Sequence, residues 1–237
     1  MSTPSGKIYL VPTPIGNMSD ITPRAVEVLT EAEVVACEDT RTSGSLLAKL
    51  GLKKRLISYH EFNERSRAGQ LMEMAQAGQN IAVITDAGAP GVSDPAYRVV
   101  RAAIEAGIDV VPLPGANSVI PALTASGLPT DRFFFEGFLP NKSGARQRRI
   151  AALQDYPHTL IFFESPHRIH KCLTDMHEVL GDRPACVARE ISKKFEEFLR
   201  GTLGELAALT EKRTLKGEIV VVVGGSIEKK RTEDDND

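Results

Sequence analysis

Short apolar runs alternate with stretches of helical periodicity through the first half of the chain. The runs are strand-sized and mostly rich in β-branched residues, and they lie at residues 8–11, 34–37, 55–58, 81–84 and 109–113. Apolar runs of this length, without polar alternation, are typical of strands buried on both faces of a sheet. The repeating order of strand and helix therefore predicts an α/β domain with a doubly wound parallel sheet.

The stretch from Ile81 to Pro95, which reads IAVITDAGAPGVSDP, organises this prediction. Its apolar run ends at Asp86, and the glycines that follow permit positive φ angles and close approach of a ligand to the backbone. Asp94 and Pro95 are residue types preferred at the N-cap and the first position of a helix. Strand, glycine loop and helix in this order place ligands beyond the carboxyl end of a parallel sheet, although an ordinary turn also fits the pattern.

The second half of the chain has a different order of predicted strands and helices. Strands are expected at 133–135, 159–163, 185–189, 195–199 and 217–223, with helices at 145–153, 166–180 and 203–209. A hairpin near residues 190–193 predicts a mixed sheet. We therefore expect an N-terminal α/β domain at 1–126, a C-terminal mixed α/β domain at 127–227 and a charged, disordered tail at 228–237.

Composition narrows the possible functions. The 237 residues carry a net charge of −2, so any surface that binds nucleic acid must be local. Three scattered cysteines argue against a disulfide framework or a zinc site, so we expect a cytoplasmic protein without a metal. No apolar run is long enough to cross a membrane. The motifs G-x-G-x-x-G, G-x-x-x-x-G-K-[ST] and G-x-S-x-G are absent, which disfavours nicotinamide, P-loop and α/β-hydrolase chemistry.

Polar or glycine-rich segments follow the predicted parallel strands, at 12–17, 38–42, 86–91 and 115–118. The carboxyl ends of parallel strands share one edge of the sheet, so we expect these segments to meet. Their backbone N–H groups and glycines suit a polar, adenosine-containing cofactor. Their carboxylates suit a ligand that carries positive charge.

The same segments resemble the tetrapyrrole (class III) methylase superfamily, and in particular its ribosomal RNA branch. The matching motifs run in order along nearly the whole chain: LVPTPIGNMSDITPRA from Leu10, ACEDTRTS from Ala36, TDAGAPGVSDP from Thr85, PGANSVIPAL from Pro114, FEGFLP from Phe135, FFESPHR from Phe162, ARE from Ala188 and KGEIVVVV from Lys216. The tetrapyrrole branch tends to carry a G-D-P-x-x-Y-type loop where this chain has DAGAP, which favours the RNA branch.

The resemblance implies a homodimer of two-domain chains, with S-adenosylmethionine in the cleft between the two domains. Carried onto this chain, it implies that the cofactor is bound by Pro12, Asp86, Ala87, Gly88, Pro90, Val92, Ser118, Phe163, Glu190, Ile191, Ser192, Gly217 and Glu218. Core packing is the alternative role for Val92 and Phe163.

The resemblance also implies methylation of a ribose 2′-hydroxyl, on a cytidine in the decoding region of 16S ribosomal RNA of the small subunit. A sulfonium methyl group is already activated, so the protein mainly aligns the reactants. The hydroxyl needs a base, or a cation beside its oxyanion. We expect Glu38 or Asp39 to act on the hydroxyl and Arg41 to hold a phosphate or the oxyanion. The alternative is that Glu38 and Asp39 cap the next helix.

A local basic run is the candidate RNA surface, and it comprises Lys142, Arg146, Arg148, Arg149 and, farther along, Arg168. Basic side chains would contact the phosphates of single-stranded RNA, while a solvated helix face is the alternative. Two other functions stay open. A small-molecule methylase of the tetrapyrrole type predicts an apolar trough, and a non-catalytic module would bind S-adenosylmethionine without turnover.

Overall fold

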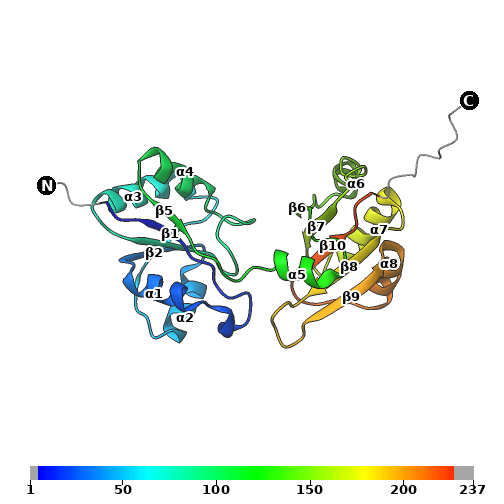
Figure 1. The fold of residues 1–237 in the computed structure, drawn as a ribbon, viewed down its shortest axis with the longest axis horizontal. Helices are drawn as coiled ribbons and strands as arrows, with labels where there is room; N and C mark the ends of the chain where they lie inside the picture. Colours follow the sequence, from blue (N-terminus) through cyan, green and yellow to red (C-terminus); the bar gives the residue numbers. More distant parts are fainter. Residues whose placement is uncertain (1–4, 227–237) are drawn as a thin grey trace, which may run out of the picture. The chain divides into compact units, whose positions relative to one another are not determined.

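The chain folds into two compact units that divide between Asn117 and Ser118, and the computed structural model describes residues 5–226 (Figure 1). Each unit contains one five-stranded sheet. The first sheet is parallel throughout and the second is mixed, which confirms the predicted fold class. Among these residues no helix combines the length and the apolar character that a membrane crossing needs.

The first unit has the strand order β3-β2-β4-β1-β5. Its strands are β1 (Ile8–Leu10), β2 (Val34–Cys37), β3 (Arg55–Ser58), β4 (Ile81–Ile84) and β5 (Val110–Pro112). Its helices are η1 (Met18–Asp20), α1 (Pro23–Glu31), α2 (Thr40–Lys49), α3 (Glu64–Gln76) and α4 (Tyr97–Glu105).

Helices cover both faces of this sheet, as Figure 1 shows. α3 and α4 pack on one face, where Leu71 and Val99 join a core with Val83 of β4. α1 and α2 pack on the other face, where Leu29 and Leu47 join a second core. Every residue of β2 and β4 is buried, which is why their sequences are apolar without alternation.

The first residues of α1 and α4 show how far local sequence signals determine where a helix begins. Thr22 caps α1 by accepting a hydrogen bond from Ala25 N at 3.1 Å, and Pro23 is its first residue, as predicted. The prediction that Asp94 and Pro95 begin α4 was wrong. The helix begins at Tyr97, and its N-cap residue makes no side-chain cap bond.

The side chain of Tyr59 replaces the missing cap of α4. Its hydroxyl oxygen accepts a hydrogen bond from Val99 N at 3.1 Å, and Tyr59 is only 2% exposed. The first backbone N–H groups of a helix have no partner within the helix. The N–H group of Val99 is therefore satisfied by Tyr59, which follows β3. Asp94 does not cap α4.

The second unit has the strand order β6-β7-β10-β8-β9. Its strands are β6 (Phe133–Phe138), β7 (Thr159–Glu164), β8 (Pro184–Arg189), β9 (Glu197–Thr202) and β10 (Ile219–Val223). Its helices are α5 (Val119–Ser126), α6 (Ser143–Ala151), α7 (Ile169–Leu180) and α8 (Leu203–Lys212). β6 and β7 are parallel, while β8 and β9 form the predicted antiparallel hairpin.

Helix α5 sets the boundary between the units. It packs against β8, β9 and β10, and Arg200 of β9 donates a hydrogen bond to Ala125 O at 2.6 Å. The sequence pattern predicted that this helix belongs to the first domain, at 1–126, and that the second domain begins at 127. The structure instead divides the chain before α5, because the apolar face of α5 is buried on the second sheet. The expected tail at 228–237 lies outside the described residues.

We predict that Tyr59→Phe lowers the free energy of unfolding by about 1–3 kcal/mol, because the buried N–H of Val99 loses its only described acceptor. Urea denaturation monitored by circular dichroism measures this change. Tyr97→Phe is the control, since Tyr97 is 73% exposed. Equal stability of the two variants would show that the hydroxyl does not cap α4.

Candidate active site

Two loops at the carboxyl edge of the first sheet are joined by a pair of backbone hydrogen bonds. Thr13 N donates to Gly88 O at 2.9 Å, and Gly88 N donates to Thr13 O at 3.0 Å. The buried Thr13 hydroxyl also donates to Thr85 O at 3.0 Å. The loops that follow β1 and β4 are therefore held together as one rim.

The loops after β2 and β5 join the same rim. Asp39 N donates a hydrogen bond to Asp86 Oδ1 at 3.3 Å. A Cβ atom at Gly115 would lie 2.7 Å from Pro12 Cβ, so only glycine permits this approach of the two loops. As predicted, the four exits meet at one edge, and they bring Pro12, Asp86 and Gly88 together.

Three carboxylates gather at this rim: Glu38, Asp86 and Asp94. Burial raises the pKa of Asp94 from 3.8 to about 6, and the negative charges of Glu38 and Asp86 add to this effect. Burial, followed by the charges of Asp86 and Glu61, also raises the pKa of Glu38. A group of carboxylates that repel one another in this way favours a bound cation or a bound proton.

The sequence pattern did not indicate that Asp94 lies at the rim, because an Asp-Pro pair after a glycine loop is the usual signal of a helix start. The Asp94 side chain instead lies among Thr85, Glu38 and Asp86, where these groups act on its pKa. Ser93 has a φ angle of 61°, so the chain makes one further left-handed turn before α4 begins. No local sequence signal distinguishes the two roles.

Asp39 has the structural role that the sequence left open. It is the N-cap of α2, and its Oδ1 accepts a hydrogen bond from Arg41 N at 2.8 Å. Its carboxylate also pairs with the Arg41 guanidinium at 2.8 Å. Hydrogen bonds from Arg41 lower the pKa of Asp39 to about 2. Glu38 is not engaged in this way, and its raised pKa makes it the better base of the two.

A cavity of about 620 Å³ lies along α2, within the first unit. It is lined by Pro14, Gly16, Met18, Asp39, Arg41, Thr42, Ser45, Leu46, Lys49 and Asp86. The lining combines cations, hydroxyls, carboxylates and a few apolar groups. It is not the apolar trough expected for a macrocyclic substrate.

In the second unit, the expected residues near β8 and β10 also come together. The Glu190 carboxylate accepts hydrogen bonds from Glu218 N at 3.0 Å and from Lys193 Nζ at 2.9 Å. Glu190 N donates to Glu218 O at 2.9 Å. Glu190 and Ser192 both have positive φ angles, so the turn after β8 is tightly constrained. Ser118, at the start of α5, belongs to this unit.

The two expected apolar contacts differ in exposure. Val92 is 39% exposed, so core packing does not explain it. Phe163 is half-buried, and its ring makes edge contacts with Phe135 at 4.9 Å and Phe138 at 5.4 Å between ring centres. Phe163 therefore belongs to an aromatic cluster on β6 and β7.

The expected RNA surface requires a correction at Arg146 and Arg168. Arg146 is 2% exposed, and its guanidinium pairs with Asp175 at 2.6 Å and donates to backbone carbonyls. Arg168 pairs with the buried Glu164 at 2.7 Å. Arg146 is thus buried in a structural ion pair and offers no surface for a phosphate. Arg168 is half-buried, with a side chain that is 22% exposed, and its guanidinium is already paired.

The other three basic residues remain at the surface. Lys142 and Arg148 are exposed, and Arg149 is exposed while its guanidinium pairs with Glu136 at 2.5 Å. A basic run in a sequence does not reveal which of its members have acidic partners elsewhere in the chain.

A family model described as tetrapyrrole (corrin/porphyrin) methylases matches residues 7–207. The chain belongs to the tetrapyrrole methylase family. Within the family, it is 52% identical over 97% of its length to the ribosomal RNA small subunit methyltransferase I of Micromonospora olivasterospora, of which it covers 74%. It is 48% identical over 93% of its length to the protein of that name from Escherichia coli O157:H7, of which it covers 78%.

Solved structures of tetrapyrrole methylases share the fold. The methyltransferase CobJ superposes with a TM-score of 0.68 at 21% identity, covering 94% of this chain and 95% of that one. Uroporphyrin-III C-methyltransferase from Thermus thermophilus, complexed with S-adenosyl homocysteine, gives 0.63 at 23% identity, covering 92% of this chain and 97% of that one. At this level of identity the likeness shows the fold alone.

We predict that Asp94→Asn stabilises the protein above neutral pH. Below pH 3.8 the carboxyl is protonated in both states, and as the pH rises to about 6 the unfolded chain releases its proton before the folded chain does. The gain in unfolding free energy is therefore about 1–3 kcal/mol near pH 8 and shrinks towards zero near pH 4. Urea denaturation across this pH range measures it. Asp131→Asn, at an exposed carboxylate, is the control, and a gain independent of pH would contradict the assignment.

We predict that two arginines of α6 contribute very differently to stability. Arg146→Ala leaves Asp175 buried without its partner and lowers the free energy of unfolding by about 3–5 kcal/mol. Arg148→Ala removes an exposed side chain and changes stability by less than about 0.5 kcal/mol. Thermal and urea denaturation of the two variants provide the comparison. Similar stability of both would mean that the Arg146 pair contributes little to the fold.

Proposed function

We propose that this protein transfers the methyl group of S-adenosylmethionine to small-subunit ribosomal RNA, at the ribose 2′-oxygen of a cytidine in the decoding region. The observation that supports this proposal most strongly is the similarity, over nearly the whole chain, to proteins named ribosomal RNA small subunit methyltransferase I. A cytoplasmic location follows from the ribosomal substrate, and a homodimer is part of the same proposal because the family resemblance implies it.

The rim of the first sheet fits the chemistry of the cofactor. S-adenosylmethionine, when bound, supplies a methyl group on a positively charged sulfur, which leaves readily without further activation. The carboxylates of Glu38, Asp86 and Asp94 favour positive charge at the rim. Gly88 has a φ angle of 90° and no side chain, so the loop after β4 presents its bare backbone.

The residues proposed to hold the cofactor come from both units. In the first unit they are Pro12, the 86–90 loop and Val92. In the second unit they are Ser118, Phe163, the 190–192 turn and Gly217–Glu218. The described contacts support this proposal within each unit, because the rim loops are joined by Thr13 and Gly88, and the turn is joined to Glu218 through Glu190.

Glu38 is the proposed general base. A ribose hydroxyl is a weak nucleophile, and its proton must leave as the carbon–oxygen bond forms. The raised pKa of Glu38 brings its carboxylate closer to the working pH than an ordinary glutamate, so proton transfer to it costs less. Arg41 is proposed to bind a phosphate of the RNA while its pair with Asp39 fixes its position.

Labelled S-adenosylmethionine tests the proposed function. The protein is incubated either with small ribosomal subunits that lack the modification or with extracted tetrapyrroles, and the label is followed. Label in 2′-O-methylcytidine after nuclease digestion supports the proposal. Label in tetrapyrroles would support the small-molecule alternative, and binding without any transfer would support the non-catalytic one.

We predict that Glu38→Gln reduces methyl transfer by about 100-fold or more, since general-base catalysis contributes about this much. S-adenosylmethionine affinity, measured by calorimetry, should stay within a few-fold of the original. Asp39→Asn is the matched variant. It weakens the cap of α2 but retains an accepting oxygen, so its turnover should fall far less. Equal losses in both variants would remove Glu38 from the role of base.

A further inference from the structure

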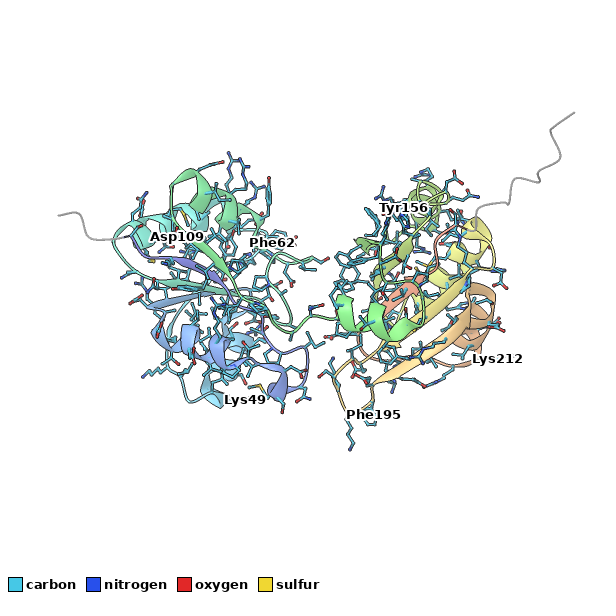
Figure 2. All side chains as sticks on the ribbon, viewed as in Figure 1. Lys49, Phe62, Asp109, Tyr156, Phe195 and Lys212 are labelled. Atoms are coloured by element: carbon cyan, nitrogen blue, oxygen red, sulfur yellow. The ribbon has the colours of Figure 1, made fainter. Side chains whose placement is uncertain are left out.

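The cavity beside α2 has features that the cofactor does not need. Arg41, Ser45 and Lys49 all line it, and they lie four residues apart along the helix. Residues at this spacing share one face of a helix. The face thus presents a cation at each end and a hydroxyl between them. Lys49, near the last turn of α2, can be found by its label in Figure 2.

The remaining residues of the lining supply other chemistry. Pro14, Met18 and Leu46 provide apolar surface, and Asp39 and Asp86 provide carboxylates. A nucleotide combines the same three requirements, because its base has an apolar face, its phosphate is an anion, and its hydroxyls and exocyclic amine are donors. An apolar macrocycle would leave the cations desolvated.

The dimensions agree with a strand of nucleic acid. The volume of about 620 Å³ lies within the range of pockets that enclose small ligands. Arg41 and Lys49 are separated by roughly 12 Å along the helix axis, which is long enough to contact more than one phosphate of a strand. A base can enter such a pocket only when it is unstacked, as in single-stranded RNA.

We propose that this cavity binds the target nucleotide of single-stranded RNA, with its base against Met18 and Leu46 and its flanking phosphates on Arg41 and Lys49. This inference rests on the proposed function and deepens it, because it assigns RNA contacts to α2 in the first unit.

Two variants test the cavity without touching Glu38. Lys49→Ala removes one cation, and Ser45→Trp fills the space from an exposed position of α2. Lys7→Ala is the control, because Lys7 is exposed, precedes β1 and pairs with Asp109 at the amino end of the sheet. Binding of a short single-stranded oligocytidylate is measured against salt, together with S-adenosylmethionine affinity and methyl transfer to unmodified small subunits.

Lys49→Ala is expected to weaken oligocytidylate binding several-fold and to reduce the slope of log affinity against log salt by about 0.7. Ser45→Trp is expected to reduce methyl transfer about tenfold or more, as steric exclusion requires. S-adenosylmethionine affinity should be unchanged in both variants, and Lys7→Ala should match the original protein in every measurement.

The failures of the two proposals are distinguishable. Suppose that the original protein methylates RNA and that both variants keep its salt slope and its turnover. This result would overturn the inference and leave the proposed function standing. Absence of transfer to RNA by the original protein would overturn the proposed function. In that case oligocytidylate binding that depends on Lys49 would still support the cavity as an RNA site, and binding that does not would overturn it.

Discussion

Parallel pairing of very short strands is the constraint on which the first unit depends. Because every strand of the first sheet points the same way, every loop that leaves a carboxyl end must emerge at one edge. The polar residues that follow β2 and β4 therefore lie close together at that edge. The proximity of Glu38, Asp86 and Asp94 is a consequence of strand direction, and the raised pKa values of Glu38 and Asp94 follow from burial and from that proximity.

Burial of the two apolar cores offsets the free energy that the repulsion between these carboxylates costs. β2 and β4 are buried on both faces between α1 and α2 on one side and α3 and α4 on the other. Their burial stabilises the sheet enough to hold carboxylates that repel each other at its edge. The Thr13–Gly88 bridge then fixes the loops by backbone bonds, so the position of the rim does not depend on flexible side chains.

The sequence predicted those features that are decided locally. The order of strands and helices, the Thr22 cap of α1, the glycine loop after β4 and the hairpin near Glu190 depend on residues close together in the chain, and the structure confirms them. The start of α4 could not be predicted, because its cap comes from Tyr59, far away in sequence. The burial of Arg146 depends in the same way on Asp175, and the placement of α5 depends on the second sheet.

The tight contact between Gly217 and Glu190 links two positions that are remote in the chain. A Cβ atom at Gly217 would lie 2.2 Å from the carboxyl carbon of Glu190, while that carboxylate accepts the N–H of the residue next to the glycine. The constraint is one-sided: a larger residue at 217 would expel the carboxylate and leave the neighbouring amide unpaired, and the φ angle of 89° already disfavours a side chain there. The reach of one carboxylate therefore depends on the absence of a side chain 27 residues further along the chain.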